Sequence, residues 1–164
     1  MTLDYSVSPD GEEFPLPSEE DYQREFRRLE DLAAQHKAQG REVVVVVGLG
    51  FVGAVMAAVI ADSTDPSGQP KKFVIGMQRP SARSFWKIPL INRGIAPMKS
   101  EDPEVEAIIH RTASEKKTLT ASYTYDAIRL ADVVVVDVQC DYIKESLDDV
   151  STGYVQMEDL ERAL

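Results

Sequence analysis

The sequence predicts an α/β protein built on a parallel sheet. Three mainly apolar runs, 43–47, 73–77 and 133–138, lack a regular alternation of apolar and polar side chains, which is typical of strands covered on both faces. Asp137 is the one charged residue within them. Stretches with helical spacing separate these runs, and strands that alternate with helices indicate right-handed crossovers within one sheet. We expect the sheet to be incomplete at its C-terminal end and to be preceded by a helical extension.

Length and composition are those of one domain. The chain has 164 residues, a formal net charge of −10 and one cysteine, Cys140, which excludes a disulfide framework and a multi-cysteine zinc site. The N-terminus lacks the features of a signal peptide, so a cytoplasmic protein is expected. Residues 71–99 carry seven Lys or Arg and no acid. This stretch fits a small phosphate-bearing ligand better than a nucleic acid, and a solvated basic face is the alternative reading.

The first 40 residues form the predicted extension, and residues 41–164 form the main domain. Residues 1–17 hold three prolines and a glycine without an apolar period, which predicts an irregular arm. Ser18 is the predicted N-cap of an amphipathic helix that stops at Gly40. Such a helix either covers an exposed face of the domain or meets a partner protein.

Residues 43–61 are nineteen consecutive residues without charge, the length of a membrane span. Five successive valines favour a strand, and two glycines would interrupt a helix, so we interpret the segment as strand, tight turn and buried helix. No membrane association is therefore expected. The remaining predicted elements are a strand at 73–77, helices near 83–92 and 103–112, a strand at 119–121, a helical turn at 125–130, a strand at 133–138 and a helix from about 155 to 164.

The motif that carries chemistry is Gly-Leu-Gly-Phe-Val-Gly at 48–53, directly after the first strand of the main domain and directly before a helix. This context is typical of a Rossmann-type, doubly wound sheet that binds a dinucleotide. Gly48 permits the tight turn, Gly50 lets a diphosphate approach the backbone, and Gly53 lets the helix pack closely. The helix N-terminus then holds the diphosphate. Glycines that serve only strand-helix packing are the alternative.

The end of the second strand bears on the choice of cofactor. An acid there normally binds the adenosine ribose of NAD, and this position is occupied by Gln78. Arg79 and Arg83 follow without a nearby acid and could accept a 2′-phosphate, which points toward NADP. Gln78 can still hydrogen-bond a ribose hydroxyl, so the choice between NAD and NADP stays open.

Three segments together resemble the N-terminal NAD(P)-binding domain of the UDP-glucose/GDP-mannose dehydrogenase family. They are the glycine loop at 48–53, Leu-Ile-Asn-Arg-Gly-Ile-Ala-Pro at 90–97 and Ala-Asp-Val-Val-Val-Val at 131–136, in the order and spacing of the family. The resemblance covers residues 41–164. It implies a nucleotide-sugar 6-dehydrogenase of polysaccharide biosynthesis, which oxidises a sugar primary alcohol to a carboxylate with NAD(P). It also implies a homodimer for the full-length protein.

The resemblance also implies a set of cofactor-binding residues. The expected diphosphate ligands are Gly48, Gly50, Phe51, Val52 and Gly53; the adenosine side is assigned to Gln78, Arg79 and Arg83, and the nicotinamide side to Val138, Gln139 and Cys140.

The chain departs from the family in two respects. Gln78 replaces the usual aspartate, and Val-Gln-Cys-Asp at 138–141 replaces a Val-Pro-Thr-Pro turn. The central dimerisation helix, the C-terminal sugar-binding domain and the catalytic residues of the family are expected to lie outside this sequence, so no catalytic residue is assigned. A nucleotide sugar would bind only with that missing domain.

Other candidate residues and readings carry less weight. An inert thiol is favoured for Cys140 over a nucleophile because no histidine is close in sequence. No metal site is predicted.

Two alternatives stay open for the function of the chain. One is a cofactor domain like those of 6-phosphogluconate and 3-hydroxyisobutyrate dehydrogenases. The other is a non-enzymatic dinucleotide-binding module that uses its N-terminal helix to recruit a partner.

Overall fold

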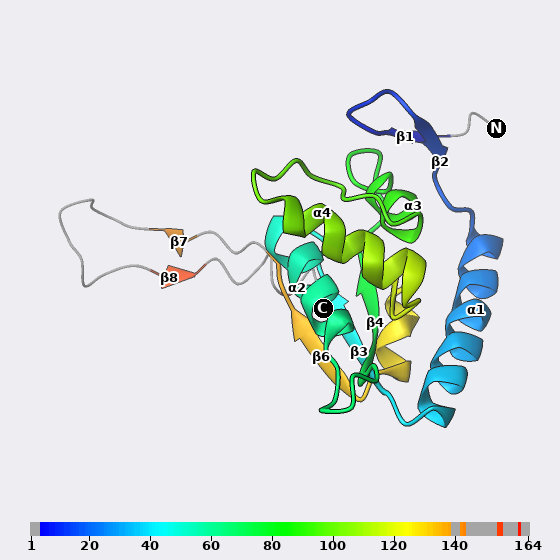
Figure 1. Cartoon of the computed structure of the whole chain (residues 1–164). Helices are drawn as coiled ribbons and strands as arrows, with labels where there is room; N and C mark the ends of the chain where they lie inside the picture. The colour runs from blue at the N-terminus through cyan, green and yellow to red at the C-terminus, as the bar shows by residue number, and fades with distance from the viewer. Residues whose placement is uncertain (1–3, 139–141, 144–153, 156–160, 162–164) are drawn as a thin grey trace.

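The computed structural model describes residues 4–138, 142–143, 154–155 and 161 (Figure 1). Its centre is a parallel sheet with the strand order β5-β4-β3-β6. These strands are β3 (Glu42–Val47), β4 (Lys72–Met77), β5 (Leu119–Ser122) and β6 (Val133–Val136). The predicted fold class, an α/β protein of the Rossmann type, is confirmed.

The strand order reverses at β3. The chain first builds outward from β3 through β4 to β5, and then returns to place β6 on the other side of β3. Val44 of β3 is in register with Val74 on one side and with Val133 on the other. The carboxyl ends of β3 and β6 therefore lie side by side, which is the place where doubly wound sheets bind their ligands.

Helices cover both faces of the sheet. On one face α2 (Phe51–Asp62) and α4 (Pro103–His110) pack with Val44, Val46 and Val74 in one core cluster. On the other face α1 (Glu19–Ala38) packs Leu29 and Ala33 against odd-numbered residues of β3 and β4, together with the 3-10 helix η2 (Tyr125–Leu130). Figure 1 shows α1 alongside the sheet, and the amphipathic helix thus covers a face of the domain.

The N-terminal segment differs from the prediction of an irregular arm. It forms a hairpin of β1 (Tyr5–Val7) and β2 (Glu13–Pro15), each with one buried central residue. Phe14 of β2 packs with Trp86 and Leu90 at α3 (Lys87–Asn92), and the backbone N–H of Trp86 donates to Ser6 Oγ over 3.1 Å. Strands of three residues are too short to show a sequence period, so only their tertiary contacts reveal them.

The two edge strands of the sheet, β5 and β6, differ in how far their outer edges are covered. At the β5 edge the Asn92 side chain acts like a neighbouring strand: its Oδ1 accepts from Ala121 N over 2.7 Å and its Nδ2 donates to Ala121 O over 3.0 Å. At the β6 edge, Val133, Val134 and Val136 are 45%, 42% and 39% exposed, and the strand ends two residues before the predicted position. Asn92 therefore satisfies edge groups that would otherwise be open.

Several boundaries shift from the predicted ones. The helix expected near 83–92 begins only at Lys87, and the helix expected at 103–112 ends at His110 and continues as a π-helical turn, η1 (Arg111–Glu115). Beyond β6 the structure describes one short antiparallel pair, β7 (Tyr142–Ile143) and β8 (Tyr154–Val155). The expected helix from 155 to 164 lies outside the described residues. No helix in the described part of the chain is both long and apolar enough to span a membrane.

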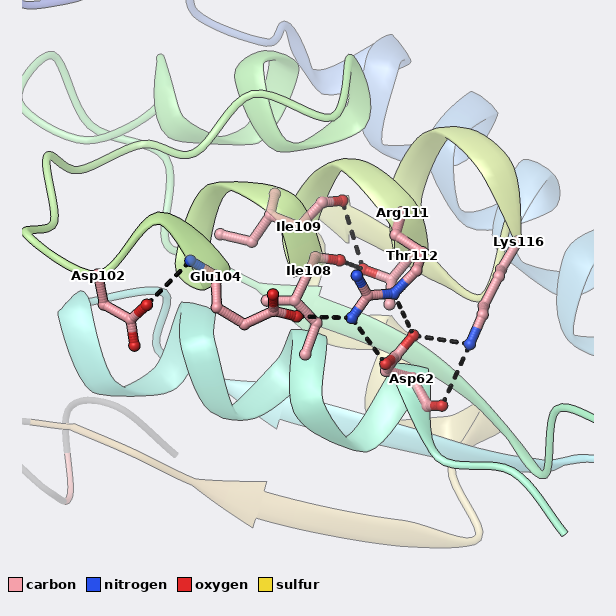
Figure 2. Close-up of polar contacts among 8 residues, drawn as sticks. All are labelled: Asp62, Asp102, Glu104, Ile108, Ile109, Arg111, Thr112 and Lys116. Atoms are coloured by element: carbon pink, nitrogen blue, oxygen red, sulfur yellow. Dashed lines mark hydrogen bonds and ion pairs between the residues drawn. The ribbon is translucent and has the colours of Figure 1, made fainter. Parts of the chain in front are cut away.

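An ion-pair network joins the end of α2 to η1 (Figure 2). Arg111 donates from Nε and Nη2 to the two carboxylate oxygens of Asp62, at 3.0 and 2.9 Å, and Lys116 Nζ adds a contact of 2.7 Å. Arg111 also reaches Glu104 of α4. Hydrogen bonds from Arg111 are the main cause that lowers the pKa of Asp62 from 3.8 to about 2. The folded state therefore favours the charged form of Asp62.

This network predicts a pH-dependent contribution to stability. A carboxylate whose pKa is lowered by folding stabilises the protein above its unfolded pKa, and this stabilisation is lost as the pH falls through the folded pKa. Asp62→Asn should lower the free energy of unfolding by about 1–2 kcal/mol at neutral pH, a value reduced for solvent screening. The difference from wild type should vanish as the pH falls from about 4 toward 2 in urea titrations.

Asp126→Asn is the matched control, because Asp126 meets only Arg129, at 3.7 Å, and both side chains are more than half exposed. Its effect should stay within about 0.5 kcal/mol at every pH. An Asp62→Asn deficit that persists unchanged at pH 2 would contradict the electrostatic explanation.

Candidate functional site

The turn after β3 has a backbone that only glycine accommodates. Gly48 has a φ of +99°, and a Cβ there would lie 1.9 Å from the backbone oxygen of Asp137, at the end of β6. A Cβ at Gly53 would lie 1.9 Å from the Gly48 oxygen and 2.7 Å from Asp137 Oδ2. Gly48 and Gly53 therefore let the turn, the first turn of α2 and the end of β6 approach one another closely.

Gly50 has the opposite surroundings. It has an ordinary φ of −69°, and a Cβ at this position would meet nothing within 4 Å. Gly50 is the N-cap of α2 and, as a glycine, has no side chain to cap the helix. Phe51 and Val52 are 57% and 56% exposed. The open space lies at a helix N-terminus with free amide groups, an arrangement that can hold a diphosphate.

The backbone of Leu49 is hydrogen-bonded to two polar side chains from the segment that follows β4. Its N–H donates to Gln78 Oε1 over 2.9 Å, and its carbonyl accepts from Lys87 Nζ over 3.2 Å. The Leu49 side chain is 1% exposed and lies against Gly76 of β4, where a Cβ would come within 2.7 Å of it. The glycine loop is thus held in place by the packing of the Leu49 side chain on β4 and by the two hydrogen bonds to the Leu49 backbone.

The end of β6 lies beside the glycine loop, on the side of β3 opposite to β4. Asp137 N donates to Val47 O over 2.8 Å, which extends the pairing of β6 and β3 by one residue. The Asp137 side chain is half-buried, as is Val138, which packs with the cluster beneath α1. Gln139 and Cys140 lie outside the described residues. The structure thereby brings together the glycine loop, Gln78 and residues 137–138.

The fold and the loop can be compared with known structures. An NDP-N-acetyl-D-galactosaminuronic acid dehydrogenase from Methanosarcina mazei Go1 matches over 84% of this chain, with a TM-score of 0.59 and 25% sequence identity. A GDP-mannose dehydrogenase from Pseudomonas aeruginosa matches over 74% of it, with a TM-score of 0.54 and 24% identity. The chain shares its fold with nucleotide-sugar dehydrogenases.

The matched region is a small part of those dehydrogenases. This chain spans 26% of the length of the first structure and 23% of the second. No protein-family model matches the sequence, and the search of curated proteins gives no match. The resemblance to nucleotide-sugar dehydrogenases, predicted from three short segments of the sequence, is confirmed by the two structural matches.

Gln78 stands where the sequence resemblance led us to expect an aspartate, and its side chain contacts the glycine loop. Gln78 braces the loop through Leu49 N, a contact that a carboxylate could also make but at the cost of a negative charge beside the diphosphate site. Arg79 and Arg83 are exposed, and neither forms an ion pair with a described residue. Both guanidinium groups are therefore available to an anionic ligand.

Two residues near the loop were not predicted as site residues. Lys87 contacts Leu49 O, and burial lowers the pKa of its ammonium group. The signal available in the sequence was its place in the acid-free basic stretch. Asp137 was assigned no role from the sequence, because its closeness to Gly48 and Gly53 depends on the pairing of β6 with β3.

Proposed function

We propose that this chain is the NAD(P)-binding domain of a nucleotide-sugar 6-dehydrogenase. The observation that carries the proposal is the contrast among the three glycines of the loop. Gly48 and Gly53 are required by close backbone contacts, whereas Gly50 faces open space at the N-terminus of α2. Glycines needed for packing alone would not explain an open Gly50. The structural neighbours, which are dehydrogenases of nucleotide sugars, support the same conclusion.

The residues present fit a nicotinamide dinucleotide. Gly48, Gly50 and the amides of Phe51, Val52 and Gly53 would hold the diphosphate. Gln78, Arg79, Arg83 and Lys87 would face the adenosine half, and Val138, Gln139 and Cys140 the nicotinamide half. When bound, the nicotinamide accepts hydride from an alcohol carbon. In the complete enzyme, a cytoplasmic homodimer, we expect two successive hydride transfers to two molecules of NAD(P), which together with the addition of water oxidise a sugar primary alcohol to a carboxylate.

Calorimetric titration with NAD and NADP side by side tests this proposal. Wild type should bind at least one cofactor, and Gly50→Asp should weaken binding by more than about tenfold, because a carboxylate would fill the diphosphate space with a like charge. Gln69→Asp is the control: it adds the same charge at an exposed position on the turn before β4, at the opposite end of the strands. Absence of binding to wild type at millimolar cofactor would refute the proposal.

The same titration separates the two cofactors. Arg79→Ala should weaken NADP more than NAD, because an exposed guanidinium and an uncharged Gln78 suit a 2′-phosphate. Equal weakening of both cofactors would show that Arg79 does not bind the 2′-phosphate.

A further inference from the structure

Asp137 places a carboxylate inside the proposed site. Its Oδ2 lies within 2.7 Å of the Cβ position of Gly53, in the first turn of α2. Its backbone oxygen lies against Gly48. The acid is therefore beside the loop that would hold a diphosphate, and not on the outer surface of the domain.

The described contacts give this carboxylate no structural partner. The N-cap of α2 is Gly50, which has no side chain to cap the helix. The Asp137 carboxylate lies close to Gly53 in the first turn, and no hydrogen bond among the described residues joins it to the amides of that turn. Among the described residues, none forms an ion pair with it, whereas Asp132 at the other end of β6 accepts from Val43 N and pairs with Lys37. The Asp132 side chain thus anchors the start of β6, whereas the Asp137 side chain makes no hydrogen bond or ion pair with a described residue.

The position of Asp137 relative to the strands decides which half of a dinucleotide it faces. The adenosine half belongs over β4, where the second strand ends, and the diphosphate belongs over the glycine loop after β3. The remaining half must continue to the other side of β3, where β6 lies. Asp137 is the first residue after β6 and so stands on the nicotinamide side of the crevice.

A carboxylate beside a diphosphate weakens binding unless another charge offsets it. The oxidised nicotinamide ring carries a positive charge and the reduced ring carries none. We infer that Asp137 is a specificity-determining residue that makes the site prefer the oxidised dinucleotide over the reduced one. This inference rests on the proposed function, and it assigns a role to a residue that the resemblance does not.

The test compares dissociation constants of NAD+, NADH and ADP-ribose for wild type and Asp137→Asn, measured by calorimetry and, for NADH, by fluorescence. Measurements use NADP+ and NADPH instead if wild type binds only those. Asp137→Asn should weaken the oxidised cofactor relative to the reduced one by about three- to tenfold, the effect of one charge in a partly solvated crevice. ADP-ribose, which lacks the ring, should bind the variant as well as or better than wild type.

Two controls keep the outcomes separate. Asp31→Asn removes one exposed charge from α1 and should leave all three constants unchanged. Asp137→Ser should reproduce the shift of Asp137→Asn, which excludes an effect peculiar to the amide. An unchanged ratio of oxidised to reduced cofactor, or an equal loss of ADP-ribose binding, would overturn the role of Asp137 alone. Failure of wild type to bind any of the three ligands would overturn the proposed function together with this inference.

Discussion

Gly48→Ala should destabilise the protein by more than about 3 kcal/mol, a large share of the stability of a domain of this size. Two effects combine. A φ of +99° is unfavourable for any residue with a Cβ, and that Cβ would lie 1.9 Å from the Asp137 backbone oxygen. Relief of this clash requires β6 to move away from the turn, which disrupts its pairing with β3. Urea unfolding followed by circular dichroism measures the loss.

Gly50→Ala is the control within the same loop. Its φ is −69° and a Cβ would meet nothing within 4 Å, so its loss of stability should be about 1 kcal/mol or less, the usual cost at a helix N-cap. Equal losses for the two alanine variants would mean that the end of β6 does not approach the turn as described.

Leu29→Ala should cost about 3 kcal/mol, within the range for a buried leucine in a close-packed site. Leu29 is 0% exposed and packs between α1 and the odd-numbered face of β3 and β4. The result would show that the helix preceding the glycine loop is part of the domain's core. Thermal and urea unfolding of the full chain provide the measurement.

Glu30→Ala, one residue further along α1 and exposed, should change stability by no more than about 0.5 kcal/mol. If Leu29→Ala were as mild as Glu30→Ala, α1 would not be anchored on the sheet, and the alternative role of recruiting a partner would gain support.

The fold was predictable because its signals are local. The valines of β3 form a run without alternation, and all five from Val43 to Val47 are buried. The glycine spacing after β3 identified the turn, in which Gly48 has a positive φ and Gly50 faces open space. The amphipathic pattern of α1 indicated a helix with one apolar face, since the spacing of Leu29 and Ala33 is set by the helix itself.

The N-terminal hairpin could not be predicted in the same way. Each strand has three residues, and what holds them is contact with distant residues: Phe14 against Trp86 and Leu90, and Glu12 paired with Arg93 at 2.7 Å. The bounds of β6 were also misjudged: the strand was predicted to continue past Asp137 to Val138, whereas it ends at Val136. Strand ends depend on the partner strand, and β3 turns away at Gly48.

The sequence by itself determined the parallel sheet, the glycine loop and the basic stretch at 71–99, because each of these depends on residues close together in the chain. Only the tertiary structure decided that Gln78 braces Leu49 and that Asp137 lies against Gly48 and Gly53. These contacts join residues from different strands, and their formation depends on strand order and register. The order β5-β4-β3-β6 places the end of β6 beside the loop, and so brings an acid from late in the chain into the site formed by the glycines.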